Sequence, residues 1–216
     1  MNLTERYPYI VIEGPIGSGK TTLAHRLADR FPLDLLLENA GANPFLPRFY
    51  QDQQRYALPT QLFFLFQRAE QVRELGQRDL FNQATVADFF LEKDPLFARL
   101  NLGDEEYALY RQIYEHLQLQ TTTPDLVIYL QTPVDTLVKR IEQRDIAYEH
   151  EISRDYLARL AEAYSDFFHH YDTAPLLIVN NDNLNVIADE DALDLLLKRI
   201  LAMRGRREYF NPRLDA

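Results

Sequence analysis

Short apolar runs alternate with longer amphipathic segments along the whole chain. The short runs consist mostly of aliphatic and β-branched residues and end in polar turns. Nearly continuous apolar runs of this length are typical of parallel strands that are buried on both faces of a sheet. The predicted strands are Tyr9–Glu13, Leu33–Leu37, Ala84–Asp88, Leu126–Leu130 and Leu176–Val179.

The segments between these strands carry apolar residues at helical spacing. One helix is expected to start with Thr132 as its cap, Pro133 at the first helical position and Asp135 reaching back. Strands that alternate with helices predict an α/β fold in which helices cover both faces of a parallel sheet. The other predicted helices are Lys20–Arg30, Thr60–Arg78, Asp104–Leu117, Ser153–His170 and Asp189–Met203.

The chain shows no internal repeat, linker or low-complexity segment, so residues 1–216 are expected to form one domain. The apolar face of Thr60–Arg78 is broad enough to serve a core and a subunit contact together. His169 and His170 close a predicted helix, where cations favour the helix dipole, and we interpret them as structural rather than as metal ligands.

Composition excludes several classes of function. The formal net charge of −10 argues against a nucleic acid as partner. The absence of cysteine excludes disulfides, thiolate catalysis and thiolate metal sites. The only locally basic segment is the C-terminal tail, which we interpret as a solvated terminus; its arginines are Arg204, Arg206, Arg207 and Arg213.

The sequence also predicts a location. The first residues carry Glu5 and Arg6 before a short apolar run, which does not resemble a signal peptide. No stretch approaches the length needed to cross a bilayer. We therefore expect a cytoplasmic protein without a membrane partner.

One motif organises the chain. Between the first strand and the first long helix, Gly14, Gly19, Lys20 and Thr21 match the phosphate-binding loop G-x-x-x-x-G-K-[ST]. Glycines let the backbone turn tightly so that its N–H groups converge on a phosphate, and the following helix adds the positive end of its dipole. A glycine-rich turn without a ligand is the alternative, but the complete motif between a strand and a helix favours a nucleotide site.

The motif assigns roles within this loop. Lys20 is expected to reach the β- and γ-phosphates of ATP, and the Thr21 hydroxyl is expected to hold Mg²⁺. The predicted nucleotide-binding residues are Gly14, Gly17, Ser18, Gly19, Lys20, Thr21 and Thr22.

Two carboxylates follow predicted strands. Glu38 ends the second strand and Asp88 ends the third, at the edge of a parallel sheet where ligands bind. Asp88, behind a phosphate loop, is placed to hold Mg²⁺ directly or through water. Glu38 has an alternative interpretation as a cap of the next turn. Arg140 and Arg144, four apart on one helix face, either converge on the transferred phosphate or form a solvated surface.

Taken together, these residues resemble the deoxyribonucleoside kinases, most closely the bacterial deoxyadenosine and deoxyguanosine kinases. The resemblance covers nearly the whole chain and rests on the phosphate loop, Glu38, Asn43–Phe45, Tyr50, Gln61, Asp88, Arg140–Arg144 and Glu149. It implies a P-loop NTPase fold with a five-stranded sheet of order 2-3-1-4-5 and a short lid. It also implies a homodimer through two long helices, and transfer of the γ-phosphate of ATP to the 5′-hydroxyl of a deoxyribonucleoside, with a purine as the preferred base.

The resemblance implies a role for each matched position. Glu38 corresponds to the base that takes the 5′-hydroxyl proton. Tyr50 and Glu149 correspond to contacts with the 3′-hydroxyl, and Gln61 to the nucleobase contact. The remaining assignments are Arg68 near the position that sets base preference, Arg140 and Arg144 in the lid, and Asn180–Asn185 over the ATP adenine.

The chain departs from the family pattern at two positions. Phe89 follows Asp88 where many members have an arginine, and Ile146 stands where many lids carry another arginine. Lys93 can supply part of the missing charge. These departures concern the rate and the preferred acceptor rather than the class of reaction.

Two other functions compete with this interpretation. A nucleoside monophosphate kinase needs arginines for its charged acceptor, but Arg48 and Arg55 are the only basic residues between Glu38 and Gln67. A regulatory nucleotide switch would carry Asn-Lys-x-Asp, which Asn180–Asp182 does not match. The sequence does not determine the base, because an amide such as Gln61 can pair with adenine, guanine or cytosine.

Overall fold

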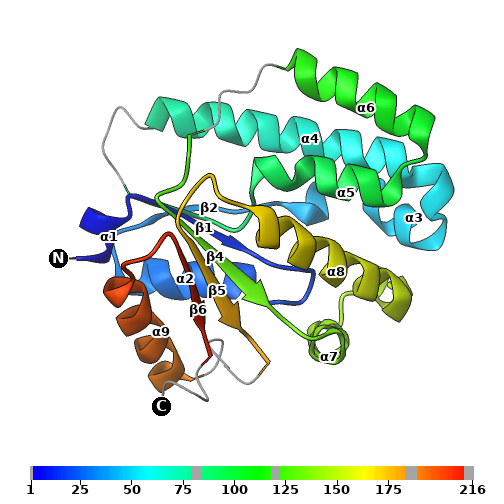
Figure 1. Cartoon of the computed structure of the whole chain (residues 1–216). Helices are drawn as coiled ribbons and strands as arrows, with labels where there is room; N and C mark the ends of the chain where they lie inside the picture. Colours follow the sequence, from blue (N-terminus) through cyan, green and yellow to red (C-terminus); the bar gives the residue numbers. More distant parts are fainter. Residues whose placement is uncertain (1, 79–83, 118–121, 183–188, 212–216) are drawn as a thin grey trace.

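A computed structural model describes residues 2–78, 84–117, 122–182 and 189–211 (Figure 1). Its strands form one sheet of order β2-β3-β1-β4-β5-β6, in which each neighbouring pair is parallel. The α/β class and the predicted order of the first five strands are therefore confirmed. The strands are β1 (Tyr9–Glu13), β2 (Asp34–Leu36), β3 (Thr85–Ala87), β4 (Leu126–Gln131), β5 (Leu176–Asn180) and β6 (Arg207–Phe210).

Two helical layers cover the sheet (Figure 1). Alternate strand residues face opposite sides: Ile10 packs in the core with α1, α2 and α9, whereas Val11 packs in the core with α3, α4, α5, α6 and α8. The helices are α1 (Leu3–Arg6), α2 (Lys20–Arg30), α3 (Leu46–Gln51), α4 (Gln53–Arg78), α5 (Asp94–Asn101), α6 (Asp104–His116), α7 (Val134–Arg144), α8 (Arg154–His170) and α9 (Glu190–Ala202). Among the described helices, none has the length and apolar character that a membrane span needs.

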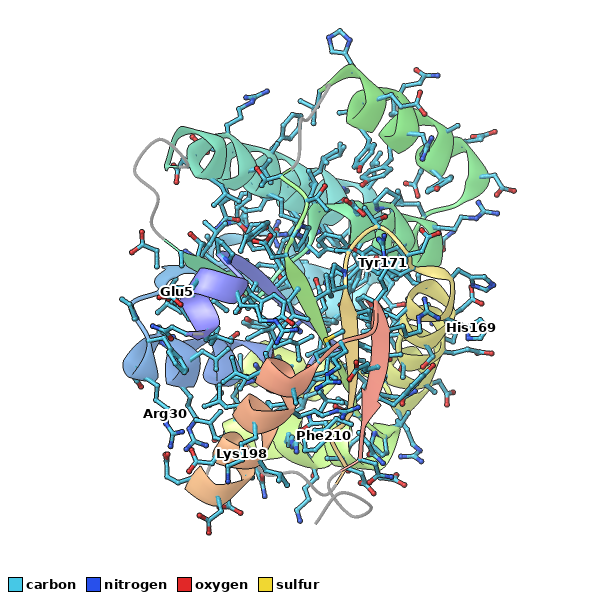
Figure 2. The ribbon with its side chains drawn as sticks, turned by 60° about the vertical axis from the view of Figure 1, so that its left-hand side comes forward. Glu5, Arg30, His169, Tyr171, Lys198 and Phe210 are labelled. Carbon is cyan, nitrogen blue, oxygen red and sulfur yellow. The ribbon has the colours of Figure 1, made fainter. Side chains whose placement is uncertain are left out.

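The sixth strand corrects the prediction of a solvated basic tail. Arg206 donates to the carbonyl of Asp172 at 2.8 Å, and Arg207 donates to the carbonyl of His169 at 2.6 Å, so both arginines bind the end of α8 and its following turn. Phe210 is buried on the side of the sheet that α9 covers (Figure 2). The prediction was wrong because β6 buries one apolar side chain, too few to give a recognisable apolar run.

Helix α4 begins before its predicted start. The sequence placed the first residue at Thr60, after Pro59, but the helix starts at Gln53 and contains Pro59. Proline removes one helical hydrogen bond, yet the helix continues through Pro59, and Ala57 just before it is fully buried. The additional turns bring α4 against α3, where both helices border the cavity described below.

The predicted cap of α7 is also wrong. The helix begins at Val134 after Pro133, which makes no side-chain cap. Thr132 instead donates to the carbonyl of Leu130 at 3.2 Å, and Asp135 pairs with Arg154 of α8 at 2.5 Å. By contrast, Ser153 caps α8 as its position suggests, accepting from the N–H of Tyr156 at 3.1 Å.

Candidate active site

The phosphate loop runs from the end of β1 to the start of α2. Gly17 and Gly19 have φ angles of +83° and +95°, a region that favours glycine. A Cβ on Gly14 would lie 2.6 Å from the Ser18 Oγ and 2.9 Å from the Leu130 carbonyl, so only glycine fits there. The three glycines of the loop thus meet two conformational needs, at Gly17 and Gly19, and one steric need, at Gly14.

Lys20, the first residue of α2, folds back over the loop. Its ammonium donates to the carbonyl of Gly14 at 2.7 Å and to that of Pro15 at 3.2 Å. These hydrogen bonds hold the side chain at the mouth of the loop, where the lysine of a phosphate loop meets the phosphates of the nucleotide.

Thr21 and Asp88 lie together beside the loop. The Thr21 hydroxyl donates to one carboxylate oxygen of Asp88, and the backbone N–H of Glu38 donates to the other at 2.7 Å. Burial raises the pKa of Asp88, while these two hydrogen bonds oppose the rise. The described residues contain no cluster of three or more His, Asp or Glu able to hold a metal. Magnesium usually takes one or two carboxylates together with substrate phosphates and water, so a hydroxyl and a carboxylate at this position fit it.

Glu38, which is half-buried, forms a charge network with the buried Arg68 of α4. The Arg68 Nε donates to the Glu38 Oε1 at 2.8 Å, and another guanidinium nitrogen pairs with Asp94. The Tyr110 hydroxyl donates to the second oxygen of Asp94. Burial alone would raise the pKa of Glu38, but the charges of Arg68, Lys93 and Lys20 outweigh it and lower that pKa. Glu38 is therefore ionised at neutral pH.

Arg68 should be a main contributor to stability. Arg68→Met leaves the carboxylates of Glu38 and Asp94 without their cation, and we expect the free energy of unfolding to fall by about 3–5 kcal/mol. Arg111→Met is the matched control, since Arg111 pairs with Glu115 on the surface and its loss should cost under about 1 kcal/mol. Urea unfolding measures both values, and equal losses would contradict this role for Arg68.

A cavity of about 190 Å³ connects the phosphate loop to Glu38 and then to an aromatic chamber. Helix α4 contributes Gln61 and Arg68 to the wall, and the segment after α7 contributes Glu149. Gln61 and Glu149 are buried, and so is the Arg68 guanidinium. The rings that line the chamber are Phe49, Tyr50, Phe64, Phe97, Tyr156 and Tyr164.

Most of the residues predicted for the site lie in this one cavity, although they come from distant parts of the sequence. They are Gly17, Gly19, Lys20, Thr21, Thr22, Glu38, Tyr50, Gln61, Arg68, Asp88, Arg144 and Glu149. Gly14 and Ser18 belong to the loop but do not line the cavity. Ser18 is fully buried, and its carbonyl accepts from Asn181 at 2.7 Å.

The two arginines of α7 have different partners in this structure. Arg140 donates to the carbonyls of Ser18 at 3.1 Å and Asn181 at 3.3 Å, which ties α7 to the phosphate loop. Arg144 forms a bidentate pair with Glu149, with donor–acceptor distances of 2.6 to 3.0 Å. Their convergence on a transferred phosphate therefore stays a prediction. Residues 183–185 of the predicted adenine loop lie outside the described residues.

Sequence reasoning missed the partners that hold the site in place. Asp94 and Tyr110 fix Arg68, while Glu13 and Tyr164 bind Lys93. A charged Lys93-Asp94 pair within an apolar stretch was the available signal. Phe89, where an arginine was expected, is buried in the core and does not reach the cavity.

Comparison with known proteins identifies the family. A family model described as deoxynucleoside kinase matches residues 10–203. The chain belongs to the deoxynucleoside kinase family. Two curated members are similar in sequence. A deoxyadenosine kinase of Lactobacillus acidophilus is 31% identical over 206 residues, covering 88% of this chain and 94% of the relative. A deoxyguanosine kinase of Bacillus subtilis is 34% identical over 158 residues, covering 73% and 76% of the two chains.

Solved structures of the family share the fold. The structure of deoxyadenosine kinase from M. mycoides with bound dCTP has a TM-score of 0.75 and 25% identity, and the match covers 90% of this chain and 100% of that one. This deoxynucleoside kinase is a phosphotransferase, as the sequence predicts, and its P-loop fold with sheet order 2-3-1-4-5 is confirmed with a sixth strand added.

Proposed function

We propose that this kinase transfers the γ-phosphate of Mg-ATP to the 5′-hydroxyl of a purine deoxyribonucleoside, in the cytoplasm. The observation that carries the proposal is the cavity, which joins the phosphate loop, an ionised glutamate and an aromatic chamber in one continuous space. A nucleobase stacks favourably on aromatic rings. The relatives of this chain that are named as deoxyadenosine and deoxyguanosine kinases support a purine as the base.

The charges of the cavity favour a neutral acceptor. Among the described residues that line it, Arg68, Lys93 and Arg144 are each paired with a carboxylate, and Lys20 is bound to loop carbonyls. An acceptor that carries a phosphate needs cations that are available to bind it. The chamber beyond Glu38 thus suits a nucleoside better than a nucleoside monophosphate.

Each residue of the reaction has a role in this proposal. Glu38 accepts the proton of the 5′-hydroxyl while the oxygen attacks the γ-phosphorus and ADP leaves. Lys20 stabilises the charge that develops on the transferred group. Thr21 and Asp88 would hold Mg²⁺, which neutralises phosphate charge when bound. Arg140 and Arg144 are assigned to the lid over the phosphates.

The acceptor is oriented by groups on the far side of Glu38. Tyr50 and Glu149 are assigned to the 3′-hydroxyl, and the fact that both line the cavity supports a joint contact. Tyr50 also stacks on Tyr148 with ring centroids 6.2 Å apart, which fixes its position. Gln61 and Arg68, two turns apart on α4, are assigned to the base.

A panel of acceptors tests this function. With Mg-ATP, deoxyadenosine and deoxyguanosine should yield 5′-monophosphates faster than deoxycytidine or thymidine. All four nucleosides should be phosphorylated faster than dAMP or dTMP. Product formation read by chromatography gives the order. Faster turnover of dAMP or dTMP than of every nucleoside would overturn the proposal. ATP consumption at the same rate with and without an acceptor would favour a regulatory nucleotide switch.

We further propose that the kinase is a homodimer whose contact includes the outer face of α4. Phe66 is 52% exposed there, and Leu62 and Phe63, one turn earlier, are only half-buried. A large exposed aromatic side chain next to other apolar residues is typical of an interface.

Phe66→Glu should convert this dimer to a monomer, because it places a charge in the apolar contact. Light scattering after size exclusion measures the mass directly. Tyr209→Glu is the matched control and should leave the dimer intact, since Tyr209 is 60% exposed on β6, at the edge of the sheet opposite the β2–β3 edge that α4 connects. A monomeric wild type, or a dimeric Phe66→Glu variant, would contradict this interface.

A further inference from the structure

Three buried polar side chains meet at the cavity wall without a role in the reaction proposed above. Glu13 comes from the end of β1, Lys93 from the short 3₁₀ helix Leu91–Lys93, and Tyr164 from α8. Their exposed fractions are 0%, 2% and 1%. Lys93 and Tyr164 both line the cavity that holds Lys20 and Glu38.

The three groups form a closed set of contacts. The Lys93 ammonium lies 2.6 Å from the Glu13 Oε1 and 2.8 Å from the Oε2, and it donates to the Tyr164 hydroxyl at 2.6 Å. The Tyr164 hydroxyl donates in turn to the Glu13 Oε2 at 3.1 Å. Both donors therefore orient the carboxylate of Glu13.

That carboxylate also binds the phosphate loop. The backbone N–H of Gly14 donates to the Glu13 Oε2 at 3.0 Å, while the carbonyl of Gly14 accepts from the Lys20 ammonium at 2.7 Å. Ser18 and Leu130 pack closely against Gly14, since a Cβ there would lie 2.6 Å from the Ser18 Oγ and 2.9 Å from the Leu130 carbonyl. The Gly14 residue thus connects the buried ion pair to Lys20.

A role in stability alone accounts poorly for this arrangement. A buried ion pair loses much of its attraction to desolvation, and apolar residues of similar size are often as stable. Here Lys93 lines the cavity in which the reaction is proposed, and the Glu13 carboxylate accepts a hydrogen bond from the phosphate loop.

We propose that Lys93 and Glu13 are a positioning pair for phosphoryl transfer: Lys93 orients the Glu13 carboxylate, which fixes Gly14 and thereby the place of Lys20. The inference rests on the proposed kinase function, because Lys20 is the group that meets the phosphates. Neither residue of the pair needs to touch the substrate.

Lys93→Met should disturb the donor side of the site selectively. We expect the Kd of Mg-ATP, titrated without an acceptor, to rise about tenfold, as for the loss of one charge-assisted hydrogen bond. We expect kcat to fall about 10²-fold, since small misplacements of a reacting group have effects of that size. The Kd of deoxyadenosine should change less than about twofold.

Two double variants separate positioning from packing, and they remain informative if Lys93→Met does not fold. Glu13→Gln with Lys93→Met removes both charges but keeps an oxygen for the Gly14 N–H, so ATP affinity and most of kcat should recover. Glu13→Leu with Lys93→Leu also removes both charges but leaves that N–H without an acceptor. It should melt several degrees below the wild type, because buried donors lose their acceptor, and should bind ATP about tenfold more weakly.

The results decide between the explanations. Wild-type ATP affinity and kcat in the leucine double variant would show that the pair only fills space, and would overturn the inference. Equal impairment of both double variants would also overturn it, because the charge of Lys93 would then act directly. The titration of Mg-ATP needs no acceptor, so it stays decisive even if the wild type phosphorylates no deoxynucleoside.

Discussion

Lys20→Ala is expected to lower kcat for phosphoryl transfer by about 10³-fold, within the range seen when a preorganised charge is removed from a phosphoryl-transfer site. The Lys20 ammonium is held at the loop mouth by the carbonyls of Gly14 and Pro15, so its position is set before the nucleotide arrives. Its loss removes the cation that should stabilise charge on the transferred group.

The fold should tolerate this change. Lys20 is part-buried and its partners are loop carbonyls rather than core groups, so the melting temperature should fall by only a few degrees. Lys198→Ala on the exposed face of α9 is the matched control and should keep full activity (Figure 2). Wild-type turnover by the Lys20→Ala variant would remove the basis for a phosphate-binding role of the loop.

Glu38→Gln is expected to lower kcat by about 10²–10⁴-fold, the usual contribution of a general base. Glutamine keeps the shape and the hydrogen-bonding reach of the side chain but cannot take a proton at neutral pH. The lowered pKa of Glu38 keeps the wild-type carboxylate ionised at neutral pH, so its oxygens are not already protonated. Binding of the nucleoside should weaken far less than kcat.

The structure adds a second consequence to this substitution. Glu38 is one of two carboxylates on Arg68, so Glu38→Gln should also reduce stability, by less than the loss of Arg68 itself. Measuring kcat, nucleoside Kd and urea unfolding on one variant separates catalysis from stability. A less stable variant with unchanged kcat would show that Glu38 serves structure alone.

The parts of the fold that could be predicted are those that follow from local pattern. Strands buried on both faces, such as β4, give continuous apolar runs, and the phosphate loop needs glycines at fixed spacing. Glu38 and Asp88 were predictable because the carboxyl ends of parallel strands meet at one edge of a sheet. That rule places two residues 50 positions apart side by side, and the hydrogen bond between them bears it out.

The rest depended on contacts that no local pattern encodes. The sequence of strand β6 is only weakly strand-like. The strand is held instead by its pairing with β5 and by arginine contacts to the end of α8. Tyr110 and Tyr164 act through hydroxyls that reach buried carboxylates from other elements. On the sequence alone, both tyrosines are ordinary core residues of amphipathic helices.

The most direct test of the proposed site is a crystal structure of the kinase with deoxyadenosine bound. The proposal predicts the 5′-oxygen within hydrogen-bonding distance of the Glu38 carboxylate. It also predicts the base in the aromatic chamber beside Gln61, and the 3′-hydroxyl near Tyr50 and Glu149. A nucleoside bound in the opposite orientation, with its 5′-oxygen away from both Glu38 and the phosphate loop, would contradict it.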